Sequence, residues 1–293
     1  MKRRSIVCGL SAVAIFGANP LLAQDVGEPG VVSELPESTV FDDDFVTIGA
    51  GVGVGATYSG SDDYRAIVVP LVQGSFAGID VNPRPAGIAI DFWGDGDDGP
   101  NYALGPVIKL NRDRVNDVDD EVVELYGELD TAIEIGPSVG VSFPKVLNPF
   151  DSLSVNADAT WDIAGAHEGF AFSPSVSYFT PVSRSAAVSL SFNAKFIDDD
   201  YADYYYSVPQ IATLLPQETL PAFRAEGGLE RIGVNLLAGY DLDGDLTNGG
   251  FAVAVIGGYS RLQGDAADTP FTSDRGSADQ FFGGLGLAYT FGL

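Results

Sequence analysis

Apolar and small polar residues alternate along most of this chain, and the alternation restricts the folds open to it. In residues 152–162 the odd positions hold leucine, valine, alanine and tryptophan, while the even positions hold serine, asparagine, aspartate and threonine. A period of two is the signature of β-strands with one apolar face. The same pattern runs through 46–58, 102–110, 129–141, 170–178, 186–196, 232–240, 251–259 and 281–291. The sequence therefore predicts an all-β protein.

The second face of these strands separates a membrane barrel from a soluble sandwich. A soluble sandwich carries charged residues on its outer face, whereas here the second face is mostly glycine, serine and asparagine. Aromatic residues mark the strand ends, as in the interfacial girdles of transmembrane barrels. They are Tyr58, Phe92, Tyr102, Trp161, Phe170, Tyr178, Tyr240, Tyr259, Tyr289 and Phe291. Because a bilayer does not tolerate an open sheet edge, we expect one transmembrane antiparallel up-and-down β-barrel.

Turn residues divide the barrel region into about twelve strands, with ten as the alternative. Bacterial single-chain barrels have even strand numbers, short periplasmic turns and longer outer loops. We expect 58–65, 112–127, 164–168, 199–221 and 263–279 outside, and the shorter 143–150, 181–184 and 242–249 in the periplasm. The expected strands are 45–58, 64–74, 75–82, 85–93, 101–111, 128–142, 151–163, 169–180, 185–198, 222–241, 250–262 and 280–291.

The N-terminus has the layout of a secretory signal. Basic residues at positions 2–4 precede a short apolar run and the small residue Ala23. We expect a signal peptide over 1–23, export through the Sec pathway, a flexible acidic leader over 24–44 and the barrel over 45–293. Cys8 lies in the segment to be removed, so we expect a mature chain without cysteine.

The formal net charge of −26 and the residue counts exclude several functions. Nucleic-acid binding needs basic residues that displace phosphate counterions. One cysteine and one histidine leave little for a thiolate or imidazole metal site. Asp241-Leu242-Asp243-Gly244-Asp245 starts like a calcium loop but lacks its required glycine and glutamate, so we favour an Asp-Gly turn. Acidic loops could bind Ca²⁺ or Mg²⁺ and so bridge to lipopolysaccharide; we favour solvated loops instead.

Several segments occur in an order and at a spacing that are typical of one protein family. Residues 58–65 are similar to a Y-x-G-S-D-D-Y-R loop, 165–169 to a G-A-H-x-G turn, and 198–208 to a tyrosine-rich D-D loop. Residues 259–270 are similar to Y-x-R-L-x-G-D-A-A-D-S-P, and 284–291 follow in register. With these segments the chain resembles the MipA/OmpV family of outer-membrane proteins, which usually ends in an aromatic residue, whereas here Gly292 and Leu293 follow Phe291.

This resemblance implies a barrel in the outer membrane of a Gram-negative bacterium, in contact with its lipid and lipopolysaccharide. For some members it also implies a scaffolding role, with a peptidoglycan lytic transglycosylase or synthase as the partner.

The single histidine is the first candidate site residue. His167 lies in a glycine-flanked turn beside Glu168 and near Asp162. An acid–base pair could serve a barrel hydrolase if a serine nucleophile lay near it. We favour a loop or rim residue with local hydrogen bonds, and we expect no catalytic residue, cofactor or metal.

A second candidate set consists of polar residues expected on the lumen face, where they would either line a water path or close it by pairing. They are Lys109, Asp130, Glu134, Asp158, Asp162, Asn193, Lys195 and Asn235. The leading hypothesis is a non-enzymatic structural or scaffolding barrel that contacts a cell-wall enzyme through residues 24–44 and the short turns. The alternative is a narrow, cation-preferring small-solute channel, and a barrel enzyme is the third.

Overall fold

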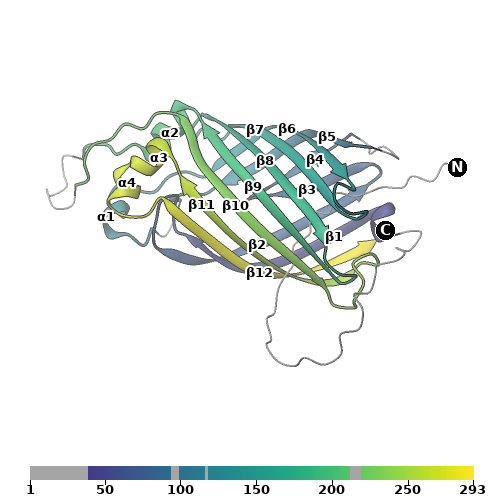
Figure 1. Ribbon diagram of the computed structural model, residues 1–293. Coiled ribbons are helices and arrows are strands. Elements are labelled where there is room, and N and C mark those ends of the chain that lie inside the picture. The colour runs from purple at the N-terminus through teal and green to yellow at the C-terminus, as the bar shows by residue number, and fades with distance from the viewer. Residues whose placement is uncertain (1–38, 94–98, 116–117, 212–218) are drawn as a thin grey trace, which may run out of the picture.

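The computed structural model describes residues 39–93, 99–115, 118–211 and 219–293, and these form a closed barrel (Figure 1). Each strand pairs antiparallel with its neighbours in sequence, and the last strand closes onto the first. The strands are β1 (Phe45–Ala56), β2 (Tyr64–Phe76), β3 (Ile79–Arg84), β4 (Gly87–Asp91), β5 (Asn101–Asn111), β6 (Ala132–Pro144), β7 (Ser152–Asp162), β8 (Phe170–Pro181), β9 (Ala186–Ile197), β10 (Gly228–Asp241), β11 (Gly250–Leu262) and β12 (Asp279–Gly292). The predicted twelve-strand barrel is confirmed and the ten-strand alternative is wrong. The predicted signal peptide and residues 24–38 of the leader lie outside the described residues.

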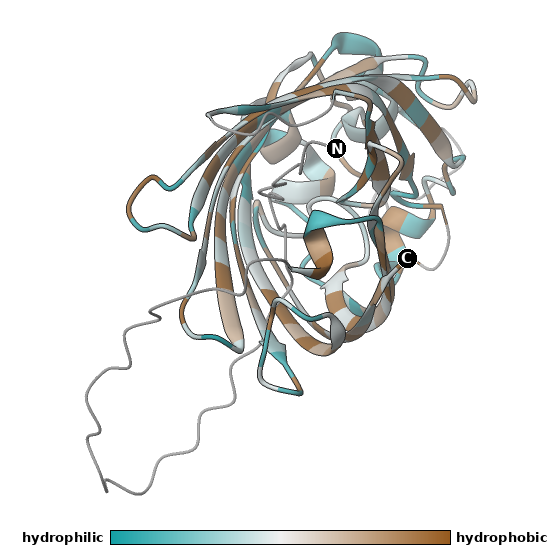
Figure 2. Ribbon diagram, turned by 90° about the vertical axis from the view of Figure 1, so that its right-hand side faces the viewer, coloured by the Kyte–Doolittle hydropathy of each residue, from teal (hydrophilic) through white to brown (hydrophobic). Residues whose placement is uncertain are grey.

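Because successive side chains of a strand point to opposite faces, the alternation in sequence places apolar residues on the outer face of the barrel and small or polar residues on the lumen face. Outward side chains such as Val52, Phe192 and Leu285 are 57%, 56% and 59% exposed. Figure 2, which looks along the barrel from the end where the C-terminus lies, shows the resulting apolar and pale bands along the strands. Exposed apolar side chains around a closed sheet are stable in contact with lipid rather than water.

The two ends of the barrel differ in their connections. At one end, the loop end, the longer connections fold into α1 (Glu121–Glu124), α2 (Asp199–Tyr206), α3 (Gly264–Asp268) and α4 (Pro270–Ser273). The other end, the turn end, carries short hairpins, the start of β1 and the C-terminus (Figure 1). Among the described residues, none of the helices has the length and apolar character that a membrane span requires. The loops predicted to lie outside are thus gathered at one end, although their helices were not predicted.

The boundary between β2 and β3 differs from the prediction. The predicted strand ends at residue 74, whereas β2 continues to Phe76 and the chain turns at Ala77 and Gly78. Both turn residues have positive φ, 53° and 81°, as the two-residue turns that match strand twist require. Alanine is not a usual signal for this backbone conformation, which explains why the turn was placed too early.

The predicted strand over 222–241 also starts too early, because β10 begins at Gly228. The amide groups just before it donate to side chains rather than to a neighbouring strand: Glu226 N–H to Asp265 at 2.8 Å and Gly227 N–H to Asp199 at 2.7 Å. Because these amide groups bond to side chains of the loops, the residues just before Gly228 lie at the loop end and not in the sheet.

Close approach of β1 and β12 predicts a size limit at the seam. A Cβ atom on Gly51 would lie 2.6 Å from the carbonyl oxygen of Leu285, so a side chain there forces the two backbones apart. We expect Gly51→Val to destabilise the barrel by about 1–3 kcal/mol. The measurement is unfolding in urea, followed by the loss of the heat-modifiable folded band on a gel, and the variant should unfold at a lower urea concentration. Gly257→Val is the matched control, because a Cβ atom there meets nothing within 4 Å. Equal midpoints for the two variants would contradict close packing at the seam.

Candidate functional site in the barrel lumen

The lumen has two unlike walls. On β7, β8 and β9 the inward positions are mostly serine and asparagine, and we call this side the polar wall; it includes Ser154, Asn156, Ser175, Ser177, Ser191 and Asn193. On β10, β11, β12, β1 and β2 they are mostly apolar or glycine, and we call this side the apolar wall; its larger members are Ile67, Val69, Leu71, Leu237, Ile256 and Phe282. The strand register therefore produces a lumen that is polar on one side only.

Helix α2 closes the lumen at the loop end. Asp198, directly after β9, starts the helix by accepting a hydrogen bond from the Tyr201 N–H at 3.0 Å, a typical N-cap. The helix then contacts opposite sides of the barrel. Asn111 at the end of β5 donates to the Tyr201 hydroxyl at 2.8 Å, and the Tyr206 hydroxyl donates to Glu230 on β10 at 2.5 Å. The helix thus lies across the mouth as a plug.

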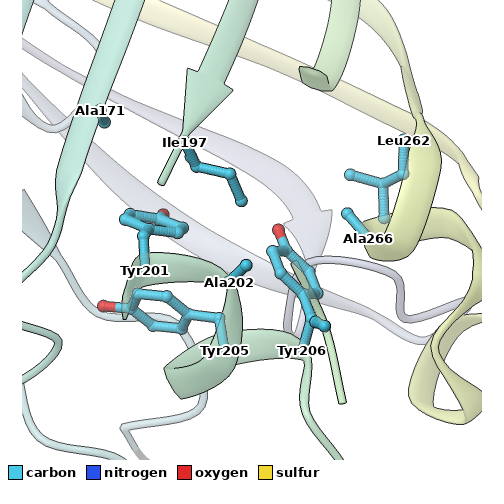
Figure 3. Packing of buried hydrophobic residues seen from close by; sticks show 9 residues of the cluster. Ala171, Ile197, Tyr201, Ala202, Tyr205, Tyr206, Leu262 and Ala266 are labelled. Atoms are coloured by element: carbon cyan, nitrogen blue, oxygen red, sulfur yellow. The ribbon is translucent and has the colours of Figure 1, made fainter. Parts of the chain in front are cut away.

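Aromatic packing holds this plug in place. Tyr201, Ala202, Tyr205 and Tyr206 are all buried and point from α2 into one cluster (Figure 3). The cluster is completed by wall and loop residues, namely Ala171, Ile197, Ala225, Leu262 and Ala266. Since large aromatic side chains contribute much of the stability of a core, the plug is a packed element of the fold.

A buried carboxylate joins the plug to the barrel wall. The register of β9 and β10 shifts between Leu229 and Arg231, which marks a bulge at Glu230. The Glu230 side chain is fully buried, with the Arg231 guanidinium 2.6 Å away and Lys195 Nζ 3.7 Å away. Lys195 also donates to the Tyr201 hydroxyl at 2.5 Å. A buried charge is tolerated only when it is paired and hydrogen-bonded, so these contacts fix the position of α2.

His167 is buried beside the plug and not exposed on the rim. Its Nδ1 accepts a hydrogen bond from the Gly169 N–H at 3.0 Å, so the ring carries its proton on Nε2 when neutral. Nε2 lies 3.5 Å from Glu134, and the ring packs edge-on against Tyr201 with centroids 4.6 Å apart. The predicted local hydrogen bonding is confirmed, since Asp162 accepts from the backbone N–H of His167 at 3.0 Å.

A second ion cluster lies on the lumen face of β3, β5 and β7. Asp158 is 3.2 Å from Arg84 Nε and 2.9 Å from Lys109 Nζ, and it accepts from the Ser138 hydroxyl at 2.7 Å. Asp158 is thus buried and paired, while Arg84 and Lys109 keep 19% and 15% of their side-chain surface exposed. The cluster ties β3 and β5 to β7.

Loops form a lid above the plug. Tyr58, Val123, Val208 and Phe271 form a second buried cluster. Asp120 caps α1 and lies 2.7 Å from Arg275. Burial alone would raise the pKa of the Asp120 carboxyl, but hydrogen bonds from Arg275 and two backbone amides hold it below its ordinary value. The lid is thus held together by an anionic cap and its cationic partner.

The acidic Asp241–Asp245 segment is a turn at the turn end. Asp241 Oδ1 accepts from the N–H groups of Asp243, Gly244 and Asp245, at 2.9, 2.9 and 3.1 Å. Hydrogen bonds from Arg184 and from Thr247 lower the pKa of Asp245 to about 2. Among the described residues no cluster of three or more histidine, cysteine or acidic side chains is arranged to hold a metal ion. The segment therefore has the geometry of the Asp-Gly turn that we favoured.

Most of the predicted lumen residues do face the lumen. Asp130 does not: it precedes β6, is exposed, and its N–H donates to the Tyr204 hydroxyl at 2.9 Å. The prediction for Asp130 is wrong because β6 begins four residues later than expected, at Ala132. Sequence reasoning missed Arg84, Glu230 and Arg231. Arg231 follows the alternation of β10, whereas a bulge turns Glu230 inward and no residue pattern indicated it.

Comparison with known proteins gives a family match. The family model described as MltA-interacting protein MipA matches residues 48–291. A comparison with curated proteins finds no match. An outer membrane channel from Pseudomonas putida F1 is similar at 12% identity and a TM-score of 0.45, over 90% of this chain and 100% of that one. OmpT of Vibrio cholerae is similar at 9% identity and a TM-score of 0.34, over 85% and 97%.

The contacts of Asp120 predict that two substitutions at this position destabilise α1 to different extents. Asparagine keeps the helix cap but loses the ion pair with Arg275, whereas alanine loses both. A lost cap costs about 0.5–2 kcal/mol and an exposed ion pair up to about 1 kcal/mol. We expect hydrogen exchange over α1, measured by mass spectrometry, to be faster in Asp120→Asn and fastest in Asp120→Ala. Equal rates in the two variants would exclude a contribution from the cap.

The contact between Tyr206 and Glu230 predicts a weaker plug when the hydroxyl is removed. A hydrogen bond to a charged group contributes about 1.5–3 kcal/mol, so Tyr206→Phe should speed hydrogen exchange over α2 by roughly tenfold or more. Tyr204→Phe is the matched control on the same helix, because its hydroxyl accepts a hydrogen bond from the exposed backbone amide of Asp130 and not from a buried charge. If both variants exchanged alike, the Tyr206 contact would not anchor the plug.

Proposed function

The chain belongs to the MltA-interacting protein MipA family, and on that premise we propose that this outer-membrane β-barrel is a non-enzymatic scaffold of the cell envelope. In this proposal the turn end faces the periplasm and holds a peptidoglycan-remodelling enzyme, of the kind that the family name indicates, close to the membrane. Export through the Sec pathway and contact with lipopolysaccharide are part of the proposal.

The plug is the observation that carries this choice over an open channel. Helix α2 closes the loop end through a buried aromatic cluster, and the Glu230 carboxylate ties it to Arg231 and Lys195. A pore that conducts by default would need this cluster to separate. A barrel that supports other proteins needs only a stable wall and an accessible face.

The turn end offers such a face. Three hairpin turns carry exposed apolar side chains: Leu147 is 78% exposed, Val182 57% and Leu242 54%. We call these three residues the apolar rim. Neighbouring turns are bonded to one another, since Asn148 donates to Thr180 at 3.0 Å and Arg184 lies 2.6 Å from Asp245. Exposed apolar side chains on a fixed support are typical of protein interaction sites.

Capture from envelope extracts tests the proposal. The wild-type barrel should recover a peptidoglycan-cleaving or peptidoglycan-synthesising enzyme, identified by mass spectrometry. Replacing Leu147, Val182 and Leu242 by aspartate should lower recovery by at least tenfold. Leu125→Asp is the control, because Leu125 is 45% exposed but follows α1 at the loop end. Recovery of assembly factors alone, or equal recovery by the rim variant, would refute the scaffold.

The polar wall supports a second candidate, a narrow cation-preferring channel. Serine and asparagine side chains can hydrogen-bond to water along much of the lumen. Planar-bilayer recording separates the two functions. A silent wild type, with conductance steps only after Tyr201, Tyr205 and Tyr206 are replaced by alanine, supports the scaffold; steps in the wild type support the channel.

A further inference from the structure

A groove runs along the lipid-facing side of β10 and β11, which lie next to each other in the barrel (Figure 1). Alternate residues of the two strands point outward there, in register with one another, and line a groove of about 480 Å³. They are Val234, Leu236, Ala238, Val255, Gly257 and Tyr259. Small-molecule sites measure about 300–1,000 Å³, so the groove is large enough to hold part of a lipid.

Glycine produces this groove. Gly257 pairs with Gly283 on β12, so two adjacent positions of the outer face lack a side chain. A Cβ atom on Gly257 would meet nothing within 4 Å, and therefore no close packing in the barrel requires glycine there. The side chains around the pair are large, since Leu236 is 49% exposed and Leu285 59%. Because unfilled space loses dispersion contacts, a flexible hydrocarbon chain of the bilayer is a stable occupant of such a groove.

An exposed cation lies above the groove, on its loop-end side. Tyr259 and Phe281 form an aromatic pair there, with ring centroids 5.2 Å apart. Two residues closer to the loop end on each strand, Arg261 and Asp279 form an ion pair at 2.8 Å. At about 3.3 Å per residue and a tilt of about 40°, Arg261 lies roughly 10 Å above Gly257. Apolar groove, aromatic pair and cation thus follow the order of acyl chains, interface and head groups in a lipid leaflet.

The guanidinium of Arg261 is held in position and remains accessible. Its Nη1 atom donates to both Asp279 carboxylate oxygens, at 2.8 and 2.9 Å. The Tyr259 hydroxyl donates to the same carboxylate at 2.6 Å, while the Arg261 side chain is 53% exposed. A guanidinium has five N–H donors and binds phosphate through two parallel hydrogen bonds. Arg261 can therefore hold Asp279 and a phosphate group at the same time.

We propose that this groove binds one phosphorylated, acylated lipid of the outer leaflet, with an acyl chain over Gly257 and a phosphate group on Arg261. The bilayer supplies hydrocarbon at the depth of the groove, and the exposed cation selects an anionic head group. The inference rests on the proposed orientation, in which the loop end faces outward, and not on the scaffold function. Its test uses the isolated barrel, so loss of lipid binding and loss of enzyme capture are separate results.

Native mass spectrometry of the folded barrel in detergent, titrated with lipid A, tests the proposal. Gly257→Val fills the groove, and Arg261→Gln removes the cation. Two matched controls make similar changes elsewhere. Ala50→Val adds bulk at another exposed outer position, on β1, and Arg184→Gln removes an exposed arginine that pairs with Asp245 at the turn end.

We expect the wild-type barrel to bind one lipid A molecule, and Gly257→Val and Arg261→Gln each to weaken binding by roughly tenfold, as the loss of a charged hydrogen bond does. Both controls should bind like the wild type. Asp279→Asn should bind at least as tightly as the wild type, because it removes the competing anion. If Asp279→Asn weakened binding as much as Arg261→Gln, the ion pair would have only a structural role, and the proposal would be overturned.

Three other results would also overturn it. The first is unchanged binding in Gly257→Val and Arg261→Gln, and the second is equal binding of lipid A from which the phosphate groups have been removed. The third is a wild-type dimer that Gly257→Val dissociates, because a second copy of the chain would then occupy the groove. If Gly257→Val does not give the heat-modifiable folded band, Gly257→Ala replaces it, with the same outcomes.

Discussion

The requirement that each backbone polar group find a partner inside a bilayer governs this structure. In hydrocarbon an unpaired N–H or C=O costs several kcal/mol, so strands can cross only as a closed sheet. The pairing of β1 with β12 closes the sheet, and Gly49, Gly51 and Gly53 let the two strands meet closely. Once the sheet is closed, alternate residues face lipid and lumen, and the composition of each face follows.

The lumen reaches stability by a different route from the outer face. There the charged groups are matched in small clusters: Asp158 with Arg84 and Lys109, and Glu230 with Arg231 and Lys195. Buried pairs of this kind specify position more than they add stability. The Glu230 cluster fixes α2 across the loop end together with the aromatic cluster, whereas the Asp158 cluster ties β3 and β5 to β7.

The sequence was sufficient for the barrel because its strongest signal, the period of two, is set by the strand itself. Twelve strands and most of the inward charges were predicted correctly. The plug was not, because residues 199–206 form a short helix stabilised by tertiary contacts of Tyr201, Tyr205 and Tyr206. The inward orientation of Glu230 depends on a bulge, and the turn at Ala77 on a backbone conformation that alanine rarely adopts. These features depend on contacts between distant segments, which local patterns do not encode.

The contrast between the two lumen walls has a consequence for water. Serine and asparagine on β7, β8 and β9 can hold an ordered file of molecules by hydrogen bonds, whereas glycine, leucine and isoleucine on β10, β11 and β1 cannot. Water in the lumen would therefore be bound along β7, β8 and β9 and excluded from the surface of β10, β11 and β1. The lumen would then have a hydrated side and a dehydrated side. Polar solutes would favour the first and apolar solutes the second.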